Sequence, residues 1–372
     1  MSERQTLTPQ DVRFLDTLDH SRWDTGAGPG FILGVVESGS VLWWRACGRA
    51  RLEPDTEPLD PSSVFYVASL SKQFTAACVA LLVSEGAVGL DDRIRRFLPE
   101  LPECFAPVCV QHLIHHIAGV PSAGTMAAEV GLGTDWWEGR GLWECIDLLS
   151  TARALAFRPG DAYAYSNEGY WLLAGIVERV TKTTLGRFAH DRLFVPLSMT
   201  QSRFRECPDV PQPGLVDGHT IAPSGSIEAV RTRFHAVGDG GLLTTLADLA
   251  RWDRVFGEEH PLGDELAVQM LQQGRLNDGS TVHYAWGLSV REHHGARIVS
   301  HGGNFIGFEA KCVRFPEYGV NVVCLANLEG LDVDGLALTA ANTLLAAVLD
   351  FGEPSWRETL LPDGRYLPRR HH

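Results

Sequence analysis

Ser69 and Lys72 are separated by two residues and can together supply a hydroxyl nucleophile and its proton acceptor. Residues 64–67 have the pattern of a strand and residues 74–83 are rich in helix formers, which places Ser69 at or just before the first turn of a helix. Residues three apart on a helix share a face, so the Lys72 amine is expected within reach of the Ser69 hydroxyl. The N–H groups of that turn would also favour the alkoxide that forms as the proton leaves.

The choice of lysine carries information because the chain has only three lysines, Lys72, Lys182 and Lys311. Arginine does not deprotonate in a protein, whereas a desolvated lysine can. Neither Lys182 nor Lys311 repeats the Ser-x-x-Lys spacing. On these four letters alone, a capped helix with an ordinary surface lysine is the simpler interpretation, so further motifs must decide.

Tyr165 and Asn167 form the only Tyr-x-Asn in the chain. A buried tyrosine beside an ammonium group can become a phenolate or share its proton, and so act as general base and then as general acid. The Asn167 amide can hold both the lysine and a substrate carbonyl. The alternative interpretation is a loop tyrosine followed by a capping asparagine.

A third motif, His301-Gly302-Gly303-Asn304, lies between two expected strands. Its two glycines would let a substrate lie against the strand edge. The backbone N–H groups of Asn304 and Ser69 could then form an oxyanion hole. Taken alone, His-Gly-Gly is more often a turn.

Hydrophobic periodicity predicts strands near both ends of the chain and helices between them. The expected strands are 31–36, 41–46, 284–290, 297–300, 308–315 and 320–326. The expected helices are one beginning at Thr8 and others at 72–84, 91–99, 110–117, 146–155, 170–180, 185–193, 245–256, 263–272 and 333–349. Residues 206–236 have a loop-like pattern.

This order predicts an α+β fold in which one antiparallel sheet, built from the N- and C-terminal segments, is flanked by helices. We expect a single domain over residues 1–372 with two lobes: an α/β lobe of about 1–66 and 284–352, and a helical and irregular lobe of about 67–283. The active site would lie between them. Residues 122–144 interleave glycines with Trp136, Trp137 and Trp143, a pattern that fits a lid or pocket wall and an irregular packed loop equally well.

Composition limits the partners. The formal net charge of -14 and the lack of a basic run argue against nucleic acid and against an anionic membrane, and favour a small-molecule or peptide ligand. The eight cysteines are scattered along the chain and are expected to be free thiols in a reducing compartment. Neither a signal peptide nor a membrane-spanning run is visible, so a cytoplasmic location is expected. The histidines at 112, 115 and 116 lack the glutamate of a zinc motif, and we predict no metal and no cofactor.

Together, Ser69-x-x-Lys72, Tyr165-Ser166-Asn167 and His301-Gly302-Gly303 resemble the three motifs of the β-lactamase and penicillin-binding-protein superfamily of serine hydrolases. The similarity runs from the first hairpin to the last helix, and the branch it most resembles contains class C β-lactamases, D-peptidases and family VIII esterases. The resemblance implies that Ser69 is acylated, that Lys72 and Tyr165 shuttle its proton and that Asn167 orients the substrate.

One departure from the superfamily affects the expected substrate. His301 stands where many β-lactamases have the lysine of Lys-Thr-Gly, and a largely neutral histidine binds a substrate carboxylate less well than a permanent cation. The resemblance therefore implies hydrolysis of a small-molecule ester or amide through an acyl-enzyme on Ser69. The alternatives are a D-amino-acid peptidase or β-lactamase, an acyltransferase, and a non-catalytic binding protein on the same scaffold.

Overall fold

The computed structural model describes residues 12–18, 21, 26–52, 56–257, 260–293 and 295–349. Most of the helix expected from Thr8 lies outside these residues. Its described part contains a short 3-10 helix, η1 (Arg13–Thr17), and the buried side chains of Val12 and Leu15.

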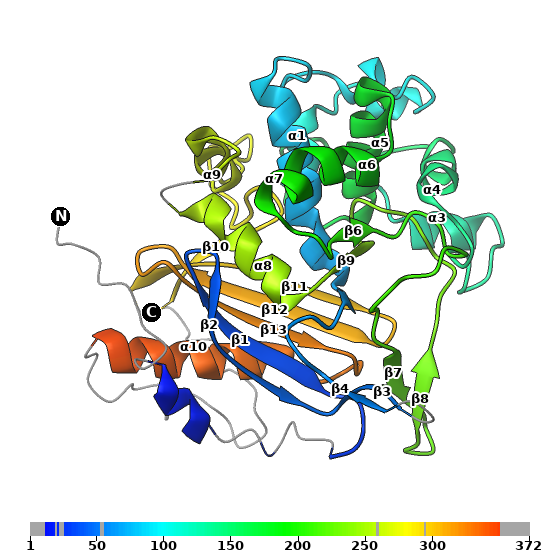
Figure 1. Ribbon diagram of the computed structural model, residues 1–372. Helices are drawn as coiled ribbons and strands as arrows, with labels where there is room; N and C mark the ends of the chain where they lie inside the picture. The colour runs from blue at the N-terminus through cyan, green and yellow to red at the C-terminus, as the bar shows by residue number, and fades with distance from the viewer. Residues whose placement is uncertain are drawn as a thin grey trace, which may run out of the picture.

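A six-stranded sheet joins the two ends of the chain (Figure 1). Its strands, in spatial order, are β10 (Ser289–His293), β11 (Ala296–Phe305), β12 (Phe308–Phe315), β13 (Val320–Ala326), β1 (Phe31–Glu37) and β2 (Ser40–Cys47). All neighbouring pairs are antiparallel. This confirms the α+β fold expected from the sequence, with the N-terminal hairpin seated beside the C-terminal strands.

The interior strand β1 has no polar side chain from Phe31 to Val36, because both of its faces are covered. Phe31, Leu33 and Val35 belong to a core shared with α10 (Val333–Leu349), whereas Ile32 and Val36 belong to the larger core on the opposite face. Side chains alternate between the two faces of a strand, so one continuous apolar run can serve two cores. Helix α10 covers one face of the sheet, and α8 (Leu246–Asp253) packs on the other (Figure 1).

The middle of the chain is mainly helical and lies on the α8 side of the sheet (Figure 1). Its helices are α1 (Lys72–Ser84), α2 (Val110–Ile114), α3 (Ala123–Glu129), α4 (Leu142–Leu149), α5 (Asn167–Thr181), α6 (Leu185–Ala189), α7 (Val195–Leu197), α8 and α9 (Asp264–Met270). The remaining strands are short: β3 (Arg49–Arg51), β4 (Glu57–Pro58), β5 (Phe65–Tyr66), β6 (Arg203–Phe204), β7 (Gly218–Ile221), β8 (Ile227–Val230) and β9 (Leu242–Thr244).

Several boundaries differ from those expected. The helix predicted at 91–99 is only a 3-10 turn, η4 (Ile94–Arg96), and α2 ends early because His116 adopts a positive φ of 58°. Residues 122–144 contain α3 and the start of α4, and the stretch 130–141 between these helices consists of turns and irregular segments. The 206–236 stretch includes the β7–β8 hairpin.

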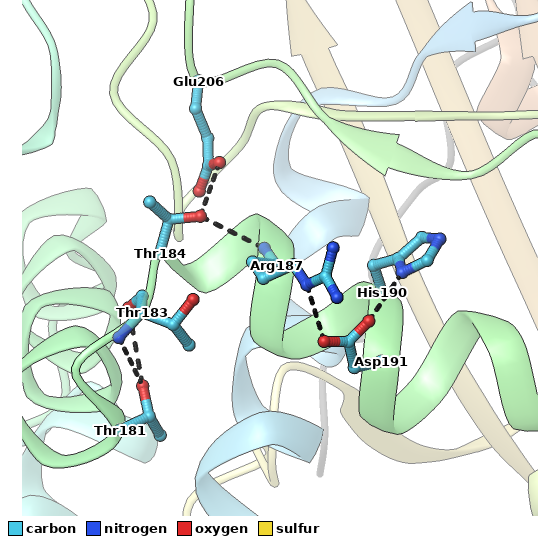
Figure 2. A network of polar contacts seen from close by, with 7 residues as sticks. All are labelled: Thr181, Thr183, Thr184, Arg187, His190, Asp191 and Glu206. Carbon is cyan, nitrogen blue, oxygen red and sulfur yellow. Dashed lines mark hydrogen bonds and ion pairs between the residues drawn. The ribbon is translucent and has the colours of Figure 1, made fainter.

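Polar contacts tie the α5–α6 junction to the segment after β6 (Figure 2). Thr184 caps α6 by accepting a hydrogen bond from the Arg187 N–H at 3.2 Å. The Glu206 carboxylate accepts from the Thr184 hydroxyl at 2.8 Å and from the Gly186 N–H at 2.7 Å. A carboxylate at a helix N-terminus satisfies N–H groups that have no partner within the helix. Both oxygens of the Glu206 carboxylate therefore accept hydrogen bonds at the N-terminus of α6.

Within the described part of the chain, the helices lack the combination of length and apolar character needed to cross a bilayer.

Candidate active site

Ser69 lies in a 3-10 turn, η3 (Ala68–Ser71), which leads from β5 directly into α1. The turn begins with a strained residue, because Ala68 has a positive φ of 44°. Side chains three apart eclipse one another in a 3-10 helix. Lys72, the first residue of α1, accordingly places its Nζ 3.0 Å from the Ser69 Oγ. The helix predicted at 72–84 is confirmed, with Ser69 in the turn that precedes it.

Lys72 is fully buried and has three hydrogen-bond acceptors. Besides Ser69 Oγ, its Nζ donates to Asn167 Oδ1 at 2.8 Å and to the backbone carbonyl of Asp239 at 2.8 Å. Burial lowers the pKa of the Lys72 amine to about 8, while the negative charges of Asp239 and Glu168 oppose that shift. A sizeable fraction of the amine is thus neutral in mildly alkaline solution and able to accept a proton.

Substitution of Asp239 tests whether nearby negative charge opposes the effect of burial on the pKa of Lys72. Its negative charge raises the pKa of Lys72, so Asp239→Asn should lower that pKa and move the acid limb of the kcat/KM profile to lower pH. Asparagine can still accept the hydrogen bond that Trp171 Nε1 gives to Asp239 Oδ1 at 2.6 Å. The pH profile of ester turnover measures the shift. An unmoved limb, or one displaced to higher pH, would show that Asp239 does not act on Lys72.

Tyr165 immediately precedes α5, whose N-cap Ser166 accepts a hydrogen bond from the Gly169 N–H at 3.0 Å. Lys72 Nζ lies 4.9 Å from the centre of the Tyr165 ring. Although 45% of the residue is exposed, burial raises the pKa of its phenol, and interaction with the Ser69 hydroxyl opposes this only in part. The phenolate form is therefore disfavoured at neutral pH. The geometry suits a protonated phenol that relays or donates a proton, with Lys72 as the base.

His116 supports Tyr165 and was not expected in this position from the sequence. The two rings lie 4.3 Å apart between centroids, and His116 Nδ1 accepts the Ser166 N–H at 3.1 Å. Burial holds the pKa of His116 well below its usual value, so the ring is neutral. It acts as an uncharged support beneath the tyrosine.

His301 lies on β11 with 9% of its surface exposed. Its Nδ1 is 2.6 Å from the Gly302 carbonyl, which can only accept, so Nδ1 carries the proton. Its Nε2 then accepts from the Tyr284 hydroxyl at 2.9 Å. Burial, followed by the charge of Lys72, lowers the pKa of His301 to about 3. The residue therefore offers no positive charge to a substrate near neutral pH.

Gly303 brings β11 against the nucleophile turn. A Cβ at this position would lie 2.2 Å from the Val67 carbonyl oxygen and 2.9 Å from the Ser69 nitrogen. Only a residue without a side chain allows this approach. The next residue, Asn304, lines the same space as Ser69, and its side-chain amide donates a hydrogen bond to the Glu309 carboxylate.

Gly303→Ala should therefore disturb the catalytic turn. We expect kcat/KM to fall by about 100-fold, because a displacement of about 1 Å at reacting groups has effects of this order. Gly302→Ala is the matched control, since its Cβ would meet nothing closer than the Ala310 carbonyl oxygen at 3.4 Å. Ester turnover and urea unfolding of both variants separate activity from stability. Equal losses in the two variants would contradict the prediction.

Two cavities meet at Ser69 and Asn304. The strand-edge cavity, 490 Å³ in volume, runs along Gly302 and Gly303 and is lined by Glu309, Asp332 and Asp334. The tryptophan cavity, 250 Å³ in volume, is lined by Glu168 and Asp239 and by the rings of Tyr66, Trp136, Trp137, Trp171, Phe234 and Phe305. Among the described residues, neither lining contains a lysine, an arginine or a histidine. Both linings are thus acidic, although Asp334 is paired with Lys311 and the Lys72 amine lies 3.0 Å from the Ser69 hydroxyl.

The structure brings most of the predicted site residues together. Ser69, Lys72 and Asn167 are connected by hydrogen bonds, and Tyr165, Gly303 and Asn304 border the strand-edge cavity with Ser69. His301 lines a different cavity of 750 Å³, next to Tyr165 and Tyr284.

The tryptophans of the 122–144 insert divide into two groups. Trp136 and Trp137 line the tryptophan cavity, as expected of a pocket wall. Trp143 instead donates its Nε1–H to Glu178 at 2.8 Å and stacks with Arg179. The insert therefore has both expected roles in different parts, wall and packing. In the portion of the chain that the structure describes, no group of three or more His, Cys, Asp or Glu side chains could hold a metal ion.

Comparison with known proteins agrees with the fold. The Beta-lactamase family model matches residues 15–347. A penicillin-binding protein of Bacillus subtilis is 28% identical over 339 residues, which cover 86% of this chain and 72% of that protein. A D-aminopeptidase of Gluconobacter oxydans is 27% identical over 349 residues, 92% of this chain but only 63% of that enzyme's own length.

A solved structure shows the same architecture. The octameric penicillin-binding protein homologue from Pyrococcus abyssi superposes with a TM-score of 0.74 at 25% identity, over 86% of this chain and 74% of that one. With the family model matching most of its length, the chain belongs to the β-lactamase family of hydrolases, alongside penicillin-binding proteins and D-aminopeptidases.

Proposed function

We propose that this protein is a serine hydrolase that cleaves an ester or amide bond of a small molecule through an acyl-enzyme on Ser69. The observation that carries the proposal is the buried Lys72 amine, whose pKa is lowered to about 8 and whose Nζ lies 3.0 Å from the Ser69 hydroxyl. A buried amine titrating near the working pH is suited to general-base catalysis.

Acylation begins when neutral Lys72 takes the Ser69 proton and the Ser69 oxygen attacks the substrate carbonyl carbon. The negative charge that develops on the carbonyl oxygen is met by the backbone N–H groups of Ser69 and Asn304. The carbon–leaving-group bond then breaks, and the leaving group receives the proton through Tyr165 from Lys72. Water deprotonated by the same pair attacks the acyl-enzyme and releases the acid, which restores the Ser69 hydroxyl.

The charges around Ser69 bear on the substrate. Five carboxylates line the strand-edge and tryptophan cavities, and His301 is neutral. A substrate with a free carboxylate beside the scissile bond would meet repulsion from these groups. The nearby cations already have partners, because Lys72 donates to Asn167 and to the Asp239 carbonyl and Lys311 is paired with Asp334. This favours neutral or cationic esters and amides over β-lactams.

A second candidate is a D-amino-acid amidase or peptidase, and the tryptophan cavity favours it. Glu168 and Asp239 lie there among the faces of several aromatic rings, a setting that stabilises an ammonium group. A free α-amino group next to the scissile carbonyl would fit this environment. Comparing D- and L-aminoacyl anilides with their N-acetylated forms tests the idea. Equal turnover of free and acetylated forms would exclude it.

The decisive experiment for the proposal is covalent labelling. A fluorophosphonate should form one adduct, on the peptide that contains Ser69, and labelling should abolish hydrolysis of a p-nitrophenyl ester. Mass spectrometry locates the adduct. Modification of another residue accompanied by loss of turnover, or turnover that survives full labelling of Ser69, would overturn the proposal.

A further inference from the structure

A groove rich in arginine lies next to the tryptophan cavity. It has a volume of 580 Å³, and its lining includes Arg51, Arg205, Arg231 and Arg233. Asp217 is the single carboxylate among its described lining residues. We call this space the arginine groove. In a chain with a formal net charge of -14, it reverses the local sign of the charge.

Two of these arginines have backbone partners that leave their charge in place. Arg205 donates to the carbonyls of Phe234 at 2.9 Å and Thr232 at 2.6 Å, and Arg51 donates to the Leu215 carbonyl at 3.4 Å. A carbonyl accepts a hydrogen bond but carries no net charge. Since each guanidinium has five N–H donors, both arginines keep donors for a ligand.

The other two arginines are only partly neutralised. Arg231 is 3.8 Å from the Asp217 carboxylate, with 88% of its side chain exposed, and such an exposed pair contributes little. Arg233 makes two hydrogen bonds with Asp209, at 2.8 Å and 3.1 Å. The groove therefore keeps a net positive charge even with that pair counted as neutral.

Glu206 follows Arg205 in the sequence but does not cancel its charge. Figure 2 shows the Glu206 side chain directed at Thr184, and its two carboxylate oxygens accept from Thr184 and Gly186 at the start of α6. The nearest acidic residue along the chain is thus held by a helix N-terminus, away from the groove.

Two aromatic rings connect the groove with the nucleophile. Tyr66 and Phe305 line both the arginine groove and the tryptophan cavity, and their ring centroids are 5.8 Å apart. Tyr66 lies three residues before Ser69, and Phe305 directly follows Asn304. The apolar surface continues into the groove with Phe308, 6.0 Å from Tyr66 between centroids.

We propose that the arginine groove is an extended subsite for the acyl part of the substrate, and that it binds an anionic far end, a carboxylate or a phosphate. The inference rests on the proposed function. An apolar acyl chain would lie against Tyr66 and Phe305, with its anion at the arginines and its scissile carbonyl at Ser69. The carboxylates of the tryptophan cavity repel an anion, so they would prevent the reversed orientation.

Kinetics with matched esters test the subsite. The mono-p-nitrophenyl esters of dicarboxylic acids from glutarate to sebacate are compared with their ω-methyl esters, and ω-phosphorylated esters form a parallel arm. For the chain length that spans the two spaces, we expect the anionic ester to have a kcat/KM about 10-fold above its neutral partner, as one or two charge-assisted hydrogen bonds would give. The preference should shrink as salt is added.

Arg51→Gln combined with Arg231→Gln should remove this preference and leave p-nitrophenyl acetate turnover unchanged. Arg51 and Arg231 make fewer contacts with neighbouring loops than Arg205 and Arg233, each of which makes two hydrogen bonds. Arg96→Gln combined with Arg187→Gln is the matched control, because it also removes two positive charges, both from surface ion pairs outside the groove. A preference that is absent at every chain length, or that survives in the groove variant, overturns the proposal.

A binding measurement separates this proposal from the catalytic one. Calorimetry on Ser69→Ala with suberate and with inorganic phosphate should show saturable binding of at least one of them that the groove substitutions weaken by about 10-fold. No binding, or binding equal in the groove variant, counts against the groove. Arginine-dependent binding in a protein whose wild type hydrolyses no ester would support the groove and remove the proposed function.

Discussion

Replacing Ser69 by alanine should lower kcat for ester hydrolysis by about 10⁴-fold or more, because loss of the nucleophile in a serine hydrolase leaves only binding and oxyanion stabilisation. The substitution removes one hydroxyl, which accepts a hydrogen bond from Lys72 at 3.0 Å, so folding should be little affected. Steady-state turnover of a p-nitrophenyl ester and fluorophosphonate labelling measure the two consequences.

Ser71→Ala is the matched control for this experiment. The Ser71 hydroxyl is fully buried, donates to the Ala68 carbonyl at 2.6 Å and accepts the Leu242 N–H at 3.1 Å. Its loss should cost about 1–3 kcal/mol of stability, the effect of leaving a buried partner unsatisfied, while labelling of Ser69 persists. If Ser69→Ala retained turnover or Ser71→Ala abolished labelling in a folded protein, the nucleophile would have been misassigned.

Replacing Lys72 should have the second largest effect. Lys72→Met keeps much of the side-chain volume but removes the base, and we expect kcat to fall by about 10³-fold, within the range of a lost general base. The wild-type acid limb, expected near pH 8 from the lowered pKa of this amine, should disappear with it. The pH dependence of kcat/KM, measured from pH 6 to pH 10, is the readout.

Lys72→Arg separates proton transfer from positive charge. Arginine retains a cation beside Ser69 and Asn167 but cannot deprotonate, so it should be as inactive as methionine. Urea unfolding identifies any variant that has lost stability instead of chemistry. Substantial activity of the arginine variant would mean that Lys72 acts as a cation, and the base would have to be sought elsewhere.

The sequence predicted the regular elements of this fold where periodicity was strong. Strands β12 and β13 and helix α1 have the predicted boundaries, because apolar runs in them end at turn residues, and α10 begins at the predicted Val333. The bounds expected for the strand at 284–290 were wrong: Gly287 has a φ of 72° and turns the chain against Gln73, so β10 begins only at Ser289 and ends at His293. That close approach joins distant segments and leaves no periodic signal.

Those site residues that belong to the three sequence motifs could be predicted, and those outside the motifs could not. Ser69 and Lys72 could be placed together because their spacing matches local helical geometry, and Asn167 because the order of the motifs resembles that of the superfamily. Asp239 was missed because it holds Lys72 through its backbone carbonyl, a group that every residue carries. His116 was considered only as a possible metal ligand, and its contact with Tyr165 depends on the tertiary fold.

The place of β1 in the sheet has a consequence for biosynthesis. The strand pairs with β2 on one side, but its other partner, β13, begins at Val320. Translation proceeds at about 5–20 residues per second, so the strand emerges from the ribosome roughly 15–55 s before its second neighbour exists. During that interval an apolar strand presents unpaired N–H and C=O groups, a template for association between nascent chains. The yield of native protein should therefore respond to synthesis rate and to chaperone supply.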